Sequence, residues 1–274
     1  DAEIARHGAR WRVAGWAETL GASKDWVPAA RDGFVPLLGA AGVIGAMPNI
    51  VSNRLNSQFD FCGPSLSVSS EELSGIRALQ IARRALQQGE IDAALVGAVD
   101  LSAEPVHRAA AAACLPADRQ QAGDAAVVLV LKRLDDIRRD GDQVLAILGD
   151  EHGKKPDVSL GDGEALNLRA LFGHAHAASG LLHVAAAVLC CGHRVLPGAV
   201  AAGRIASWKG KAPLGASIVT QALGGQEART FIEEPPADLR RPLAGVSRDD
   251  GPAFLAALRE GARLATPPLL VLPA

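Results

Sequence analysis

The sequence predicts an α/β fold with a sheet that is buried on both faces. Two continuous apolar runs, 92–99 and 124–131, are typical of strands in such a sheet. A helical pattern at 71–88 precedes the first run, and another at 133–140 follows the second. This alternation of strands and helices is characteristic of the α/β class.

Local signals support the remaining elements in chain order. Residues 65–69 alternate polar and apolar side chains, which predicts a strand. Ser69 or Ser70 is suited to cap the helix at 71–88, and Gly89 is suited to end it. Further patterns predict a strand at 143–148, a helix of small residues at 175–192, and strands at 214–221 and 227–233.

The two ends of the chain differ from this middle part. Residues 1–50 are rich in glycine and weakly periodic, so only short helical and extended pieces are expected there. Towards the C-terminus, repeated prolines predict a linker over 235–274 with one helix at 252–264. We therefore expect one domain over 1–234. A chain that starts at Asp1 is expected to be a piece of a larger multidomain protein.

Composition argues against several classes of function. The 274 residues are 49% hydrophobic and carry a formal net charge of −2. No basic stretch persists and aromatic residues are scarce, so we expect no binding to nucleic acid or to an anionic membrane surface. The sequence contains no signal peptide or membrane-spanning run. A cytoplasmic protein is expected.

The cysteines and histidines predict neither a disulfide nor a metal site. Two of the four cysteines are adjacent, which hardly permits a normal disulfide between them, and no C-x-x-C motif occurs. A group of histidines matches no standard zinc spacing, and no carboxylate completes it. Its members are His174, His176, His183 and His193. We expect reduced thiols and no metal.

Five segments carry a family resemblance. Residues 51–75 (VSNRLNSQFDFCGPSLSVSSEELSG) resemble the approach to the nucleophile of β-ketoacyl synthases, where G-P-S and a strand lead to a catalytic cysteine. Residues 82–100 resemble the family's helix and G-E-x-D turn, and residues 124–145 its K-R-L-x-D helix and G-D turn. Residues 173–180 (GHAHAASG) resemble its G-H-x-x-x-A-A-G loop, and residues 222–234 its G-F-G-G turn. All five follow the family order.

The resemblance implies a particular architecture. It implies a thiolase-like αβαβα layered fold of two related halves, each supplying a mixed sheet, with a shortened N-terminal part. In the family, the strand before the nucleophile pairs with its counterpart across a dimer axis, which also protects an apolar strand edge. The residues that match this dimer strand are Ser65, Leu66, Ser67, Val68 and Ser69.

Only part of the family's catalytic site is retained. Aligned from G-P-S at 63–65, the nucleophile position falls on Glu72, whose carboxylate cannot form a stable, exchangeable thioester. Glu72 could instead cap the helix, anchor a dimer contact or act as a general base. Cys62 lies before the strand and is expected to be a buried structural thiol. The second catalytic histidine matches His174, which could bind a carbonyl or serve only structure.

Other family positions are changed. No H-G-T-G-T loop, which carries the first catalytic histidine, is found, and Arg169 stands where the family has a lysine. The phenylalanine that gates the acyl pocket in G-F-G-G is Leu223, followed by Gly224 and Gly225.

The resemblance therefore implies a non-catalytic partner. We expect a chain-length factor of a polyunsaturated fatty acid or polyketide synthase, which forms a heterodimer with an active ketosynthase and shapes the acyl pocket. It would have no cofactor of its own, because substrates arrive on the phosphopantetheine of an acyl carrier protein. Two alternatives are a decarboxylating or weakly active acyltransferase that uses Glu72 and His174, and a purely structural domain of a megasynthase.

Overall fold

The computed structural model describes most of the chain, which divides into two compact units. One, here called the helical unit, comprises Asp1–Ser67 and Ser102–Leu115. The other, the sheet unit, comprises Val68–Leu101 and Pro116–Ala274. The described residues are 2–102, 105–150, 156–193, 215–239 and 269–272, with the short pieces 196–197, 200–201, 204–205 and 208–209.

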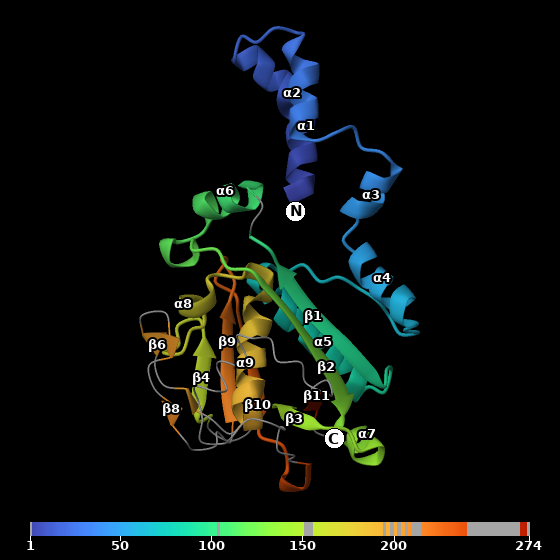
Figure 1. The fold of residues 1–274 in the computed structure, drawn as a ribbon, viewed down its shortest axis with the longest axis vertical. Coiled ribbons are helices and arrows are strands. Elements are labelled where there is room, and N and C mark those ends of the chain that lie inside the picture. The colour runs from blue at the N-terminus through green and yellow to red at the C-terminus, as the bar shows by residue number, and fades with distance from the viewer. Residues whose placement is uncertain are drawn as a thin grey trace. The chain divides into compact units, whose positions relative to one another are not determined.

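The helical unit contains helices where the sequence predicted short helical and extended pieces. Within 2–67 no strand is found. Its helices, in blue and green in Figure 1, are α1 (Ala2–Thr19), α2 (Trp26–Phe34), α3 (Ala40–Ala46), α4 (Ile50–Phe59) and α6 (Pro105–Cys114).

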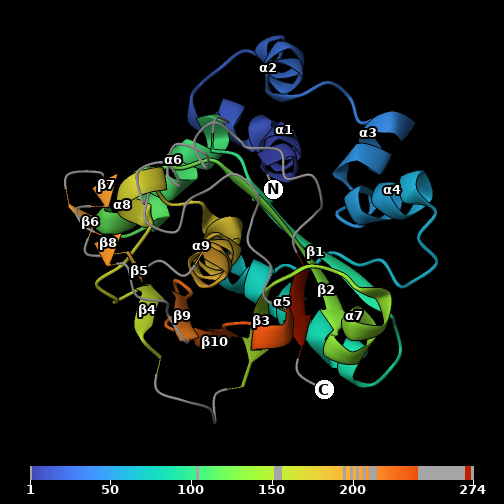
Figure 2. The same cartoon turned by 60° about the horizontal axis from the view of Figure 1, so that its bottom comes forward.

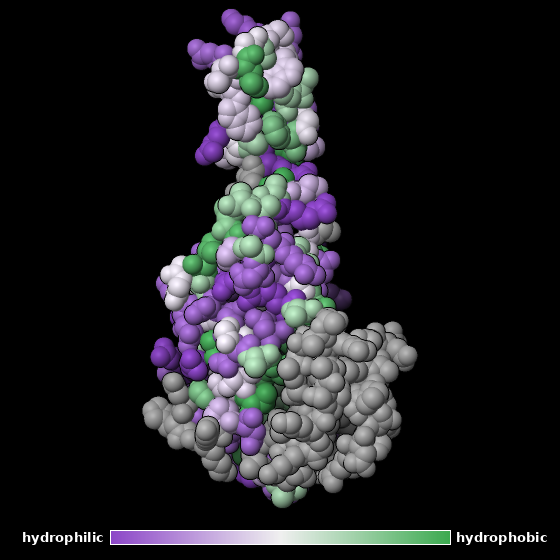
Figure 3. Space-filling view, turned by 90° about the vertical axis from the view of Figure 1, so that its left-hand side faces the viewer, coloured by the Kyte–Doolittle hydropathy of each residue, from purple (hydrophilic) through white to green (hydrophobic). Residues whose placement is uncertain are grey.

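Helices α1 and α2 pack as a small hairpin. Val13 of α1 is fully buried, and the rings of Trp16 and Phe34 meet edge to face with centroids 5.8 Å apart. An ion pair of 2.6 Å joins Arg10 of α1 to Asp32 of α2. Outside this contact, polar and hydrophobic residues intermix on the face of the hairpin shown in Figure 3.

The sheet unit is built on one mixed sheet of seven strands. Its order is β1-β2-β11-β3-β10-β9-β4, so β1 and β4 are the edges (Figure 1). Neighbours pair antiparallel in β1/β2, β3/β10 and β9/β10, and parallel in β2/β11, β3/β11 and β4/β9. The strands are β1 (Ala93–Asp100), β2 (Ala125–Arg133), β3 (Val144–Gly149), β4 (Val158–Gly161), β9 (Gly215–Gln221), β10 (Glu227–Glu233) and β11 (Leu269–Leu272).

The helices of the sheet unit agree with the predicted ones. They are α5 (Ser74–Gln87), preceded by the 3₁₀ turn η1 (Glu71–Leu73), α7 (Leu134–Asp140), and α9 (Ser179–His193), preceded by η3 (His176–Ala178). Short pieces that the sequence did not predict are η2 (Ala117–Arg119), α8 (Arg169–Phe172) and η4 (Ala237–Leu239).

Two expectations are met differently, and a third is not tested. The described strands form one large sheet rather than two, because β11 joins β2 to β3; only the ribbons β5 (Leu196–Pro197) with β8 (Trp208–Lys209) and β6 (Val200–Ala201) with β7 (Arg204–Ile205) lie outside it. Strand β11 also arises within the expected linker. The helix expected at 252–264 lies outside the described residues.

The predicted strand at 65–69 is wrong for the single chain. Residues Ser65 to Ser69 have no regular secondary structure, and Leu66 is half exposed. A strand is stabilised by hydrogen bonds to a neighbouring strand, and no described strand pairs with this segment.

Helices α5 and α9 lie together on one face of the sheet (Figure 2). α5 packs on β1 and β2, and α9 packs across β2, β3, β9 and β10. Glycines allow the two helices to approach closely: a Cβ on Gly75 would lie 2.8 Å from Leu181, and one on Gly180 would lie 2.6 Å from Ile76. Ile76 and Leu181 are fully buried in the main hydrophobic core.

The opposite face of β1 and β2 is apolar and exposed. Alternate residues of β1 point away from the helices, and Leu95 and Val99 are 45% and 57% exposed. Val128 of β2, which pairs with Gly97 between them, is 62% exposed. The sequence predicted a sheet buried on both faces, but the described chain covers only one face here.

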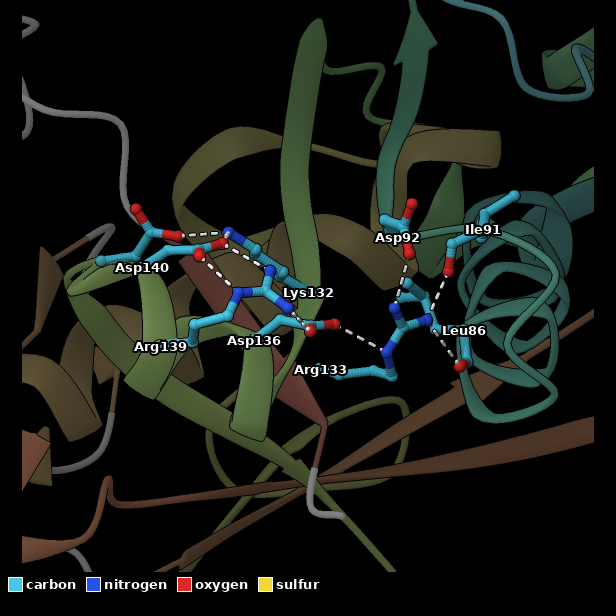
Figure 4. A network of polar contacts seen from close by, with 9 residues as sticks. Leu86, Ile91, Asp92, Lys132, Arg133, Asp136, Arg139 and Asp140 are labelled. Atoms are coloured by element: carbon cyan, nitrogen blue, oxygen red, sulfur yellow. Dashed lines mark hydrogen bonds and ion pairs between the residues drawn. The ribbon is translucent and has the colours of Figure 1, made fainter.

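Ion pairs join the ends of β1, β2, α5 and α7 (Figure 4). Arg133 donates to the carbonyl oxygens of Leu86 and Ile91 and pairs with Asp92 and Asp136. Lys132 pairs with Asp140, the last residue of α7, and with Asp142, two residues further on. The K-R-L-x-D segment therefore serves the fold. None of the helices in the described part of the chain is long and apolar enough to cross a membrane.

Candidate functional site

Glu72 lies in the turn that begins the buried helix α5. The hydroxyl of Ser74 stabilises this turn, because it accepts from the Ser70 N–H at 2.9 Å and donates to the Glu71 carbonyl at 2.6 Å. Glu71 has a left-handed backbone (φ 50°), which is uncommon outside glycine. The Glu72 side chain points inward and is only 1% exposed.

The Glu72 carboxylate has partners for both oxygens. Oε1 lies 3.0 Å from Nη1 of Arg119, and Oε2 accepts the backbone N–H of Leu223 at 3.2 Å. Arg119 belongs to η2 and is itself buried, and the same Nη1 also donates to the Gln221 carbonyl at 3.0 Å. The buried carboxylate is therefore held in a charge-assisted ion pair.

His174 approaches the same carboxylate from the loop before α9. Its backbone pairs with the segment before β2, accepting from Gly123 N–H at 3.0 Å and donating to the Gln121 carbonyl at 2.7 Å. A Cβ on Gly123 would lie 1.9 Å from the Phe172 carbonyl oxygen, so this crossing needs glycine. The buried Nε2 of His174 lies 3.5 Å from Glu72 Oε1.

The surroundings of Glu72 keep it ionised. Burial alone would raise the pKa of Glu72, but the His174 imidazole, its own backbone N–H, the charge of His176 and the Leu223 N–H lower that pKa to about 2. An ionised, internally paired carboxylate is a poor nucleophile and a poor proton donor.

Known proteins with similar sequences are polyketide synthases. Residues 28–136 match the β-ketoacyl synthase N-terminal domain family. The chain is 34% identical over 120 residues to a phthioceranic/hydroxyphthioceranic acid synthase of Mycobacterium tuberculosis, and the match covers 39% of this chain and 6% of that protein. It is 34% identical over 154 residues to the highly reducing polyketide synthase frbB of a Dothideomycetidae species, covering 50% of this chain and 6% of that one.

Solved structures agree on the fold. The ketosynthase from module 6 of the bacillaene synthase of Bacillus subtilis superposes with a TM-score of 0.55 and 20% sequence identity, covering 73% of this chain and 53% of that one. An oxazolomycin ketosynthase domain from Streptomyces albus gives 0.55 and 20% over 70% of this chain and 50% of that one. The similarity to β-ketoacyl synthases therefore covers residues 28–136 in sequence, and the solved structures extend it as a likeness of fold. The chain spans about half the length of these ketosynthase structures.

The sequence prediction of an α/β, thiolase-like fold is therefore confirmed, with a chain that is shortened relative to solved ketosynthases. Two of the sequence-predicted site residues, Glu72 and His174, lie together in the sheet unit. Their assignment to the nucleophile and second-histidine positions rests on the motif alignment and stays a prediction.

The residues of the predicted gate lie beside Glu72. Leu223, Gly224 and Gly225 form the turn between β9 and β10, closed by a hydrogen bond of 2.8 Å from the Ala222 N–H to the Gln226 carbonyl. Gly225 has a left-handed backbone (φ 82°), which this turn requires. The Leu223 side chain is 46% exposed, while its N–H binds Glu72.

Arg169, at the family's lysine position, is held in ion pairs. It pairs with Asp118 and Asp162, and Asp162 also accepts the backbone N–H of Gln221 at 2.9 Å. This network fixes the segments around Arg119 and Gln221 and gives Arg169 a structural role.

The two cysteines of the sheet unit are not placed for acyl transfer. Cys190 and Cys191 are buried in α9, and burial raises the pKa of both thiols, that of Cys190 to about 12. Cys62 and Cys114 belong to the helical unit and are exposed, so the expectation that Cys62 is buried is wrong.

Sequence reasoning missed Arg119. Arg119 is one of many charged residues, and nothing in its flanking sequence signals that it is buried. The sequence placed His176 in a group of histidines, but the spacing of that group predicted no metal site. In space its ring lies 5.1 Å from that of His174, centroid to centroid, and its backbone is left-handed (φ 41°).

Proposed function

We propose that this ketosynthase-like domain is a non-catalytic chain-length factor that works in the cytoplasm. It would form a heterodimer with an active ketosynthase in fatty acid or polyketide synthesis, of the polyunsaturated fatty acid kind, and shape the pocket for the growing acyl chain. Acyl groups would arrive on the phosphopantetheine arm of an acyl carrier protein, and the domain would need no cofactor of its own for this role.

One observation carries the proposal. Glu72, at the motif's nucleophile position, is buried and paired with Arg119 and the Leu223 N–H. For the Glu72 carboxylate to attack a thioester, it would have to leave this ion pair. That would leave a buried charge without its partner, which costs several kcal/mol. The pair therefore supports a site that has exchanged acyl transfer for structure.

The exposed apolar surface supports a partner. The uncovered face of β1 and β2 (Leu95, Val99 and Val128) and the half-exposed Leu66 have no cover within the described chain. Surfaces of this kind usually mark protein contacts. The segment 65–69 lacks a strand neighbour and could gain one from a ketosynthase partner.

The chain-length role is tested by reconstitution. We expect Leu223→Ala and Leu223→Phe, assayed in the complex with the active ketosynthase, to shift the distribution of product lengths in opposite directions, as measured by mass spectrometry. Leu37→Ala is a matched control on an exposed leucine of the helical unit. If the complex assembles and all variants make the same products, the purely structural alternative replaces this role.

The decarboxylase alternative is tested separately. His174 Nε2 faces the Glu72 carboxylate and both side chains are buried, which does not favour binding of a malonyl group there. We expect no carbon dioxide release when the purified chain is incubated with malonyl carrier protein. Release that disappears in His174→Ala would support the decarboxylase instead.

A further inference from the structure

We propose that Glu72, His174 and His176 form a binding site for one divalent transition-metal ion, of which zinc is the best match. The sequence predicted no metal, because the histidine spacing matches no standard zinc pattern and no carboxylate was expected to complete the group. Glu72 lies 102 residues before His174 in the sequence (174 − 72), and folding brings it to the two histidines. This inference does not rest on the proposed function.

The donor set fits zinc. Two imidazoles and one carboxylate, with a fourth position left for water or a ligand, are a common zinc arrangement. Imidazole nitrogens also favour the late first-row divalent ions over magnesium and calcium, which prefer oxygen ligands. Each of the three side chains offers one ligand atom, and these atoms all lie within 4.8 Å of one another.

The geometry is close to that of an occupied site. Tetrahedral zinc bound at ~2.1 Å places neighbouring donors ~3.4 Å apart. Glu72 Oε1 and His174 Nε2 already lie 3.5 Å apart. The ligand atom of His176 lies within 4.8 Å of both, and His176 is partly exposed, which gives an ion access to the cluster.

A buried nitrogen independently points to a ligand. The His174 side chain is 4% exposed, and its Nε2 is buried without a hydrogen-bond partner, since its contact with Glu72 does not meet hydrogen-bond geometry. Buried polar atoms are normally satisfied, so an unsatisfied one requires an explanation. A metal ion between Nε2 and Oε1 would satisfy it.

The other histidines of the sequence cluster do not belong to this site. Both ring nitrogens of His183 are occupied: Nε2 accepts the Leu168 N–H at 3.1 Å, and Nδ1 lies 2.8 Å from the Ser179 carbonyl. The side chain of His193 lies outside the described part of the chain.

Arg119 opposes metal binding. Its charge lies 3.0 Å from the oxygen that would bind the ion, so it competes with the metal for Oε1. The guanidinium keeps a second acceptor in the Gln221 carbonyl, to which it can remain bonded while the ion takes the carboxylate. Arg119 should therefore weaken the site and tune its affinity.

Zinc binding by the purified chain tests the site. The protein is stripped with a chelator and titrated with zinc against a chromophoric competitor, with bound metal counted by elemental analysis. We expect one equivalent of zinc, with affinity reduced tenfold or more in His176→Ala. His107→Ala, which changes a histidine of α6, should bind like the wild type. Where the alanine variant is unfolded by circular dichroism, His176→Gln replaces it.

Two further readouts separate this site from adventitious binding. Cobalt in place of zinc should give the visible absorption of a tetrahedral ion, and that absorption should be lost in His176→Ala. Arg119→Gln, which removes the competing charge but keeps a donor for Gln221, should bind zinc more tightly. No stoichiometric metal in the wild type, or equal zinc affinity in wild type and His176→Ala, would overturn the proposal.

Discussion

At the scale of single residues, the balance of charge around Glu72 determines what the site can do. A carboxylate that is almost fully buried needs compensation, and here Arg119 and a backbone N–H supply it. The same contacts that stabilise the charge also occupy the carboxylate. Chemistry on an acyl group would have to disrupt them, so stability and acyl transfer are in conflict at this position.

Removing the positive partner should destabilise the protein strongly. Arg119→Met leaves the Glu72 charge buried and without its ion pair, and we expect the free energy of unfolding to fall by about 3–5 kcal/mol. Urea denaturation followed by circular dichroism measures this. The double variant Glu72→Gln/Arg119→Met should recover part of the loss, because both charges are gone. Equal stability of Arg119→Met and wild type would contradict the ion pair.

The same carboxylate should make stability depend on acid. Because folding lowers the pKa of Glu72 from 4.5 to about 2, its contribution is present above pH 4.5 and is lost as the pH falls from 4.5 to about 2. The loss is on the order of 3 kcal/mol. Urea denaturation across this window, compared with Glu72→Gln, isolates the contribution. Parallel pH profiles for the two proteins would be inconsistent with an ionised Glu72.

The sequence could predict Glu72 and His174 as site residues, but it could not predict Arg119. The G-P-S and G-H-x-x-x-A-A-G matches identified Glu72 and His174, which the fold brings together. Arg119 has no local signature, because its burial depends on where the segments around Gln221 and Asp162 meet in space. Charge pairing between distant segments is a tertiary property that periodicity and spacing do not encode.

At the scale of elements, helices α5 and α9 cross on one face of the sheet. Gly75 of α5 and Gly180 of α9 lie at the crossing, and side chains there would meet Leu181 and Ile76. These contacts place the start of α5, and so Glu72, against the loop that carries His174. The crossing therefore links helix packing to the geometry of the site.

A methyl group at the crossing should separate the helices. In Gly180→Ala the new Cβ would lie 2.6 Å from Ile76 Cγ1, and we expect a loss of about 1–3 kcal/mol in the free energy of unfolding, measured by urea denaturation. Gly15→Ala is a matched control, because that glycine also lies in a helix but has no atom within 4 Å of its added Cβ. We expect the control to be neutral or to gain up to about 1 kcal/mol. A Gly180→Ala variant as stable as the control would contradict this packing.

Elements that depend on a neighbour were predicted least well. Strands such as β1 and β2 and helices such as α5 carry their own patterns, and the sequence located them closely. The segment 65–69 has a strand pattern but no strand neighbour in the chain, and β11 is a short apolar run among prolines that is placed by its pairing with β2 and β3. In both segments, the presence or absence of a neighbouring strand decides whether a β-strand forms.

At the scale of the whole molecule, the β1 and β2 end of the sheet is covered by helices on one face and exposed on the other. Helices α5 and α9 bury the inner residues of β1 and β2, whereas the outer residues are apolar and exposed. β1 is also an edge strand. Such a surface is expected to be buried in a functional assembly.

A charge on this surface should disrupt assembly and leave the fold intact. We expect Val128→Lys to weaken complex formation with the ketosynthase partner in size-exclusion chromatography, since a buried lysine in the interface would be unpaired. The circular dichroism of the variant should match the wild type, because Val128 is 62% exposed. Leu37→Lys, at an 80% exposed position of the helical unit, is the control. A complex of unchanged affinity would exclude this face as the contact.

The most direct measurement is acyl loading followed by intact-mass spectrometry. The purified chain is incubated with an acyl carrier protein thioester, with an active ketosynthase as the positive control. Because Glu72 is engaged by Arg119 and the sheet unit holds its thiols buried, we predict that the ketosynthase gains the mass of one acyl group and this chain gains none. A stoichiometric acyl adduct on this chain, removed by Glu72→Gln or by Cys62→Ser, would contradict the account.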